Sequence, residues 1–177
     1  TIPISKLVLT VNGGQKPPDL PDSERLEVII SEEDVTDKGK FIQIGRHEGY
    51  VLTTDDDIEY PPDYVEKMIF HVEEYDRRCM VGVHGAHIPE GPAITRWWEY
   101  MNYRRSIVFH QEIPEYHLAN VIGTGTLAFH TDTGIPNPEE FDYQRMVDLH
   151  LATWAQINRV PMVICFRGRD WLKEIKS

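Results

Sequence analysis

The sequence predicts an α/β protein whose mixed, mainly parallel β-sheet is flanked by helices, and three observations carry this prediction. Short runs of adjacent apolar, often β-branched residues recur along the chain and are typical of buried strands. Between several of these runs, apolar residues recur three and four positions apart, as on one face of an amphipathic helix. Strands that alternate with helices favour a sheet of this kind. With 177 residues the chain is long enough for one core, so we expect residues 1–177 to form a single domain.

The predicted elements follow one another along the chain. Strands are expected over residues 6–11, 26–30, 49–54, 79–84, 120–129 and 160–166. Helices are expected from Pro61 onward, over residues 95–105 and over residues 142–157. Pro61 and Pro62 mark the first of these helices because proline is favoured at a helix start. The third strand contains adjacent apolar residues and is therefore expected to be buried on both faces.

Charge and hydropathy exclude two classes of protein. The 18 basic and 29 acidic residues leave a net charge of −11, which opposes attraction to the phosphates of nucleic acids. We therefore expect no nucleic-acid partner, and an anionic small substrate would need a local cation. No apolar stretch approaches the roughly 18 residues that cross a bilayer, so we expect a soluble or peripheral protein. Cys79 and Cys165 lie in apolar runs and are predicted to be buried free thiols, which fits the cytoplasm.

An acidic triplet, Asp55, Asp56 and Asp57, follows the third predicted strand. In an extended chain, residues two apart project to the same face, so Asp55 and Asp57 would converge while Asp56 points away. Carboxylate oxygens suit Mg²⁺ or Mn²⁺, which completes its coordination with substrate phosphates and water. Ligands of open α/β sheets also bind beyond the carboxyl ends of strands. The alternative interpretation is a solvated acidic turn before a helix, where the helix dipole favours negative charge.

Further motifs accompany the acidic triplet along most of the chain. They are Asn12-Gly13 after the first strand, Gly39-Lys40-Phe41, residues 54–64, residues 82–85, residues 123–126 and an acidic helix start near Asp148. With these motifs the sequence resembles the GT-A glycosyltransferases, especially the bacterial family 2-like enzymes of surface polysaccharide synthesis. The resemblance implies metal-dependent transfer of a sugar from a UDP- or GDP-linked donor to a glycan or lipid-linked acceptor.

The resemblance also implies the residues of the donor site. Asp55 and Asp57 would form the DxD motif, with Asp57 on Mn²⁺ or Mg²⁺ and Asp55 on the nucleotide ribose or a metal-bound water. Asp56 belongs to the same donor-binding set, and Lys40 resembles a basic donor-site residue. The alternative for Lys40 is a solvated surface lysine. The metal would stabilise the departing diphosphate as a Lewis acid.

A catalytic carboxylate is implied at the start of a late helix, where inverting members of the family remove the proton of the acceptor hydroxyl. Asp148 matches this position best, and Asp142 and Glu140 are the other candidates. The alternative for Asp148 is a carboxylate on the solvated face of an amphipathic helix.

Three more groups of residues admit a functional and a structural interpretation. Gly123 and Thr124 belong to a glycine motif that would let the backbone approach the donor or acceptor sugar, or that forms a plain bulge. Aromatic residues at 97, 98, 100 and 103 would stack on an acceptor sugar, although packing is the commoner role at helical spacing. Metal ligation is conceivable for one histidine near the motifs, but packing is favoured for each of His84, His130 and His150.

One departure from the family concerns the start of the chain. GT-A domains usually begin with a strand and a helix that form the base and ribose pocket, whereas residues 6–11 correspond to the second strand. Either the chain is a shortened form or those residues lie elsewhere. Two other functions therefore stay open: a sugar-nucleotide nucleotidylyltransferase, or a non-catalytic carbohydrate-binding or assembly subunit with the same fold. Peripheral association with the inner face of a membrane, or with a complex, is compatible with all of these functions.

Overall fold

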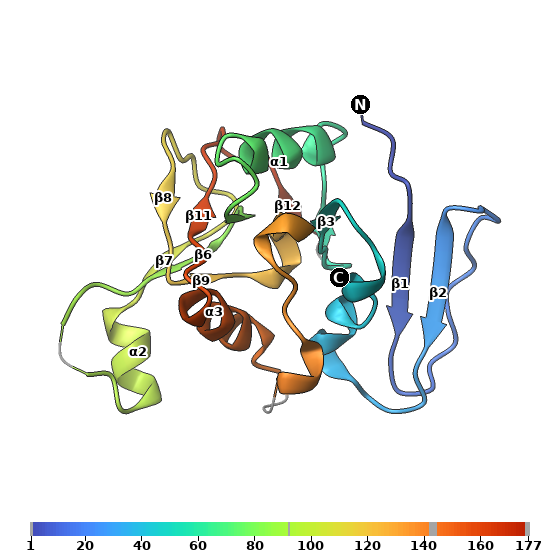
Figure 1. Ribbon diagram of the computed structural model, residues 1–177, viewed down its shortest axis with the longest axis horizontal. Coiled ribbons are helices and arrows are strands. Elements are labelled where there is room, and N and C mark those ends of the chain that lie inside the picture. The colour runs from blue at the N-terminus through green and yellow to red at the C-terminus, as the bar shows by residue number, and fades with distance from the viewer. Residues whose placement is uncertain (1, 92, 142–144, 176–177) are drawn as a thin grey trace.

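The computed structural model describes residues 2–91, 93–141 and 145–175, and its helices lie around a mixed sheet (Figure 1). The strands are β1 (Leu7–Val11), β2 (Leu26–Ile30), β3 (Tyr50–Leu52), β4 (Ile58–Glu59), β5 (Met80–Gly82), β6 (Gly85–His87), β7 (Arg105–Ile107), β8 (His117–Leu118), β9 (Val121–Ile122), β10 (Ala128–His130), β11 (Met162–Ile164) and β12 (Lys173–Glu174). The α-helices are α1 (Tyr64–Glu73), α2 (Trp97–Tyr103) and α3 (Val147–Ile157). Short 3-10 helices are η1 (Thr36–Phe41), η2 (Ile44–Arg46), η3 (Thr124–Thr126), η4 (Thr131–Thr133) and η5 (Pro138–Glu140).

The central sheet has five strands in the order β3-β10-β5-β11-β8. Its β5–β11 pair is parallel, whereas β10 runs antiparallel to β3 and β5, and β8 runs antiparallel to β11. The predicted mixed α/β architecture is confirmed, but the expectation that parallel pairs predominate is wrong. Within the described residues of the central sheet only β5 and β11 are parallel, and the chain segment between them includes α2 and α3 and the antiparallel strands β8 and β10.

Helices α1 and α3 pack against opposite faces of the central sheet. Neighbouring strand residues alternate between two clusters, since Met80 packs in the cluster that contains α3 and Val81 packs in the cluster that contains α1. The helix α1 contributes Tyr64, Met68 and Val72, which recur every four residues and are at most 3% exposed. The helix predicted after the two prolines is therefore confirmed, with its first turn at Tyr64.

A gap separates the first two strands from the central sheet. The strands β1 and β2 form a parallel pair of their own, visible beside the rest of the molecule in Figure 1. Within the described residues, β1 pairs with β2 alone and β3 pairs with β10 alone. A cavity of about 260 Å³ lies between β1 and β3, lined on one side by residues 5–8 and on the other by residues 50–54. The strand β3 is therefore half-buried, and the prediction that it is buried on both faces is wrong.

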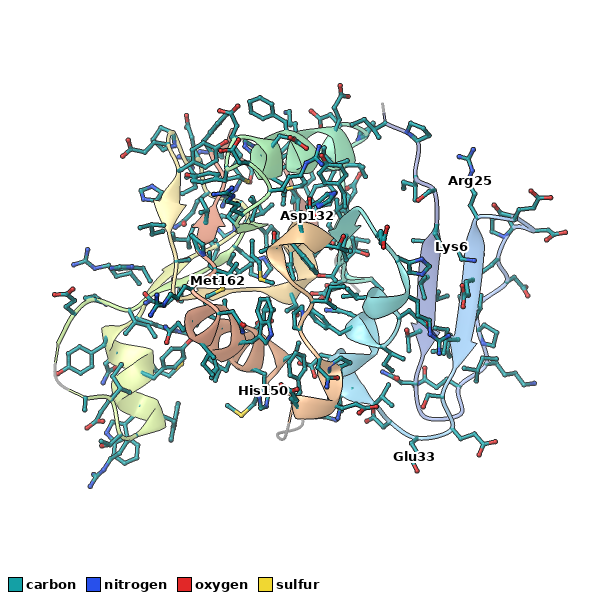
Figure 2. The ribbon with its side chains drawn as sticks, in the orientation of Figure 1. Lys6, Arg25, Glu33, Asp132, His150 and Met162 are labelled. Atoms are coloured by element: carbon teal, nitrogen blue, oxygen red, sulfur yellow. The ribbon has the colours of Figure 1, made fainter. Side chains whose placement is uncertain are left out.

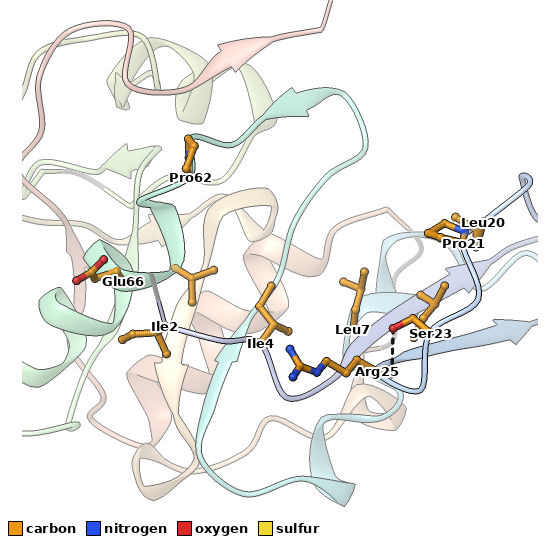
Figure 3. Close-up of a pocket in the computed structure, with 11 residues that line it drawn as sticks. Ile2, Ile4, Leu7, Leu20, Pro21, Ser23, Arg25, Pro62 and Glu66 are labelled. Carbon is orange, nitrogen blue, oxygen red and sulfur yellow. Dashed lines mark hydrogen bonds between the residues drawn. The ribbon is translucent and has the colours of Figure 1, made fainter.

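A further cavity, of about 510 Å³, is apolar and lies beside β1 and β2 (Figure 3). Its walls come from the N-terminal segment, the loop before β2 and the start of α1, and they include Ile2, Ile4, Leu7, Leu20, Pro62 and Val65. None of the acidic triplet lines this cavity. This cavity is therefore not the candidate active site, which we place at the acidic triplet.

Other boundaries differ from the prediction in informative ways. The glycine-interrupted segment 120–129 divides into β9, η3 and β10, while residues 85–87 and 105–107 form two unpredicted strands that join β9 in a small antiparallel sheet. The last helix begins at Val147, and residues 142–144, including the candidate Asp142, lie outside the described residues. The two cysteines are buried and free, as predicted. In the part of the chain that the structure describes, no helix has the length and apolar character needed to cross a bilayer.

Candidate active site

The acidic triplet lies in a turn at the carboxyl end of β3, immediately before β4. Asp55 is half-buried, whereas Asp56 and Asp57 are exposed. Because β3 ends at Leu52, the alternation of an extended strand does not set the directions of these side chains, and that part of the prediction is wrong. The backbone carbonyl of Asp57 accepts a hydrogen bond from the N–H of Ile175 at 2.7 Å, which fastens the turn to the C-terminal segment.

A second segment, the turn η3, anchors the acidic turn. The Thr53 hydroxyl donates to the carbonyl of Thr124. Tyr60 connects the two segments: its hydroxyl accepts the N–H of Asp55 at 2.8 Å and donates to the carbonyl of Gly125 at 2.6 Å. Burial, followed by the nearby carboxylates, raises the pKa of Tyr60 well above its usual range, so the hydroxyl keeps the proton that it donates.

The Asp55 carboxylate lies directly on η3. A Cβ added at Gly125 would be 2.0 Å from Asp55 Oδ2, so only glycine leaves room for this carboxylate. The other oxygen, Oδ1, pairs with the ammonium of Lys40 from η1. The structure therefore brings together Asp55, Lys40 and the glycine motif, three features that lie far apart in the sequence.

Asp148, which belongs to α3, also contacts η3. It lies in the first turn of α3, and its Oδ1 accepts the N–H of Thr124 at 2.8 Å. Asp148 also lines a cavity of about 180 Å³ together with Asp37, Tyr100 and Arg145. Asp55 and Asp148 thus contact neighbouring residues of η3, Gly125 and Thr124. The second candidate, Glu140, is exposed in η5, where its carboxylate accepts from Asn137 at 3.3 Å.

The glycine motif forms the scaffold of the site. Both backbone groups of Thr124 have protein partners, since its N–H donates to Asp148 and its carbonyl accepts from Thr53. The N–H of Gly123 donates to the carbonyl of His84 at 3.0 Å, and its own carbonyl accepts from Thr126 at 3.2 Å. The glycine motif therefore positions the acidic side chains. This role can be recognised only from the tertiary structure.

All three histidines near the motifs contact aromatic rings, and His84 lies edge-on to Phe109 with ring centroids 6.1 Å apart. His130 lies edge-on to Tyr50 with ring centroids 4.8 Å apart, and His150 stacks on Phe141 at 5.3 Å. Figure 2 shows His150 on the side of α3 that faces away from α1. The packing interpretation thus holds for His130 and His150. Within the described residues, no group of three or more His, Cys, Asp or Glu side chains converges as a ready metal cluster.

A divalent cation would nevertheless find suitable ligands at the acidic turn. Mg²⁺ and Mn²⁺ prefer hard oxygen ligands and commonly use one or two protein carboxylates, with phosphates and water as the rest. The exposed carboxylates of Asp56 and Asp57, next to the half-buried Asp55, supply such a set. The donor chemistry fits a cation that arrives with an anionic ligand.

The aromatic residues of α2 lie on the surface. No residue of this helix is buried, and Trp97 and Trp98 are 72% and 46% exposed. These side chains are therefore not core residues, although Tyr100 is half-buried. Tyr100, in the middle of α2, lines the cavity that Asp148 also lines, which places this helix beside the candidate base.

A mixed sheet with helices on both faces, and with carboxylates from two elements gathered at one glycine turn beyond β3, is the kind of arrangement in which α/β enzymes bind ligands beyond the carboxyl ends of their strands. The model described as Glycosyl transferase family 2 matches residues 39–133, more than half of the chain, and the protein belongs to this family. The family has the GT-A fold and glycosyltransferase activity, and its members generally use nucleotide-sugar donors and glycan acceptors. The match includes Lys40, the acidic triplet and η3, and ends before Asp148. No curated protein matches the chain significantly.

Proposed function

We propose that the protein transfers a sugar from a UDP- or GDP-linked donor to a hydroxyl of a glycan or lipid-linked acceptor, with a divalent cation and with inversion at the anomeric carbon. One observation carries this proposal. Asp55, at the carboxyl end of β3, and Asp148, at the start of α3, are both held on η3. Membership of the family gives the class of reaction. We assign Asp55 to the donor side of the site and Asp148 to the acceptor side.

On the donor side, the residues of the acidic turn would hold the cation. Asp57 is the proposed direct ligand, with Asp55 beside it and Asp56 at the edge of the site. The Mn²⁺ or Mg²⁺, when bound, supplies Lewis-acid stabilisation of the leaving diphosphate. Lys40 adds a second positive charge, already positioned by its ion pair with Asp55. Such local charges are needed because the chain as a whole carries −11.

On the acceptor side, Asp148 is the proposed general base. Its Oδ1 is occupied by the N–H of Thr124, which orients the carboxylate and leaves Oδ2 for the acceptor. The acceptor oxygen bonds to the anomeric carbon while the bond from that carbon to the diphosphate oxygen breaks. The hydroxyl proton passes to Oδ2 of Asp148. A single displacement of this kind inverts the anomeric configuration.

We propose that the acceptor is presented at a membrane surface through α2. The helix exposes Trp97, Trp98, Met101 and Tyr103, and residues 93–105 contain three arginines against one glutamate. Indole and phenol rings next to arginine favour the headgroup region of a bilayer, and a local positive charge favours anionic lipids. Because Tyr100 lines the cavity of Asp148, the membrane-facing helix adjoins the acceptor side. The buried free thiols fit the proposed cytoplasmic side of that membrane.

The test of the proposed reaction measures binding and turnover of a panel of UDP- and GDP-sugars with and without Mn²⁺. We expect Mn²⁺-dependent binding of one donor class and slow release of the free sugar when no acceptor is present. The matched control is Glu59→Gln, which neutralises an exposed carboxylate just past the turn. Synthesis of a sugar nucleotide from a nucleoside triphosphate and a sugar phosphate would instead establish a nucleotidylyltransferase. Sugar binding with no turnover under any condition would establish a non-catalytic subunit.

A further inference from the structure

His84 lies close enough to Asp148 and Asp55 to be influenced by the charges of both. It follows β5 and is half-buried. Of the three histidines near the motifs, His84 is thus the one that the fold brings to the candidate site. Unlike His130 and His150, it has a hydrogen-bonded partner that belongs to η3.

The hydrogen bonds around Thr126 determine which ring nitrogen of His84 carries the proton. Thr126 is fully buried, and its Oγ1 accepts the N–H of Val83 at 3.0 Å and lies 2.9 Å from His84 Nδ1. Among the described residues, Nδ1 is the one acceptor that its hydroxyl proton reaches. A buried hydroxyl without an acceptor is unfavourable, so Thr126 donates to Nδ1 and the imidazole proton resides on Nε2.

The backbone of Gly123 fixes the position of that proton. A Cβ at Gly123 would lie 1.8 Å from His84 Nε2, so the ring rests directly on this glycine. The carbonyl of His84 accepts the N–H of Gly123, which holds the two segments together. Burial lowers the pKa of His84, and the charges of Asp148 and Asp55 oppose this effect only in part. The side chain is therefore a rigid, neutral N–H donor at the surface of η3.

We infer that the Nε2–H of His84 donates a hydrogen bond to a hydroxyl of the donor sugar. This inference rests on the proposed function, in which the transferred sugar lies between the diphosphate side at Asp55 and the base at Asp148. A neutral donor suits a neutral hydroxyl, because it has no net charge to draw it into an ion pair with either carboxylate. The hydrogen bond would discriminate among donor sugars by the position of one hydroxyl.

The direct test compares binding of UDP and GDP with binding of the corresponding sugar nucleotides, all with Mn²⁺. We expect His84→Phe to bind the nucleoside diphosphate as the parent does and to bind the sugar nucleotide roughly 3- to 10-fold more weakly, the loss of one hydrogen bond. His84→Gln, whose amide nitrogen reaches a similar position, should recover part of the lost affinity. A deoxy donor lacking the contacted hydroxyl should bind the parent and His84→Phe equally.

A second measurement examines the hydrogen bond between Thr126 and His84 without any substrate. Long-range nitrogen NMR of the parent should show His84 as the Nε2–H tautomer, Thr126→Ser should preserve that spectrum, and Thr126→Val should alter it. Equal losses of UDP and sugar-nucleotide affinity in His84→Phe, unchanged sugar-nucleotide affinity, or an Nδ1–H tautomer in the parent would each overturn the inference. If the parent binds no sugar nucleotide while Mn²⁺-dependent UDP binding persists, the proposed transfer fails together with this inference. Parent binding that His84→Phe leaves unchanged removes the inference alone.

Discussion

Replacing Gly125 by alanine should displace the Asp55 carboxylate and leave the backbone in place. A Cβ at Gly125 would lie 2.0 Å from Asp55 Oδ2, whereas ordinary contacts begin at 3.4 Å. The carboxylate must therefore move by about 1.4 Å, the difference between those two distances. Gly125 is not among the residues with positive φ, so alanine introduces no backbone strain.

The displacement should affect binding much more than folding. A shift of about 1 Å in a positioned group costs on the order of 10²-fold in function, so we expect Mn²⁺-dependent affinity for UDP or GDP, or turnover, to fall by about that factor. The Lys40–Asp55 pair is partly exposed, and losing it should cost about 1 kcal/mol or less of the free energy of unfolding.

The assay is calorimetric titration of nucleoside diphosphate with Mn²⁺, together with thermal unfolding of the same samples. Gly45→Ala is the matched control, because no atom lies within 4 Å of its added Cβ. If Gly125→Ala binds the nucleoside diphosphate as tightly as the parent, the position of the Asp55 carboxylate does not matter for this binding. An equal loss in Gly45→Ala would show that the effect is not specific to the site.

Three further outcomes are expected. Asp57→Asn should nearly abolish Mn²⁺-dependent binding of the nucleoside diphosphate in titrations while circular dichroism stays unchanged, and undiminished binding would remove Asp57 from the site. Asp148→Asn should lower transfer by about 10² to 10⁴ and leave donor affinity within a few-fold, since a general base acts on the acceptor proton; transfer at the parent rate would end the inverting assignment. Trp97→Ser combined with Arg104→Gln should weaken sedimentation with phosphatidylglycerol vesicles most, because the indole and the charge both act there, and should weaken the lesser association with phosphatidylcholine vesicles through the indole alone. Equal binding of parent and variant to both lipids would refute a role of α2 at the membrane.

The sequence predicts those parts of the fold that local patterns determine. The helix α1 is recognisable because its buried residues recur every four positions after two prolines. The buried strands β5 and β11 are recognisable from continuous apolar runs. The direction of β10 is not recognisable, because a strand of three residues carries no information on which neighbour it will pair with.

The sequence points to the aspartates of the candidate site but not to the contacts that hold them in place. Asp55, Asp57 and Asp148 follow from a short motif and a family resemblance, and the fold brings Asp55 and Asp148 to one turn. The contacts that hold them there link residues distant in sequence, as Tyr60 is 65 positions from its acceptor at Gly125. Gly123 and Gly125 leave room for the side chains of His84 and Asp55, and only tertiary contacts reveal this role.

The gap between β1 and β3 has a consequence for how the protein behaves at high concentration. Within the described residues, each of these strands has a ladder partner on one side only, so the other side is a strand edge. Strand edges of this kind are where proteins aggregate edge to edge or exchange strands with a neighbouring molecule. Lys6, ion-paired to Glu27 at the start of the β1–β2 pair, is the kind of charged residue that discourages such pairing. Self-association, where it occurs, should therefore begin with strand pairing at this gap, ahead of the exposed aromatic rings of α2.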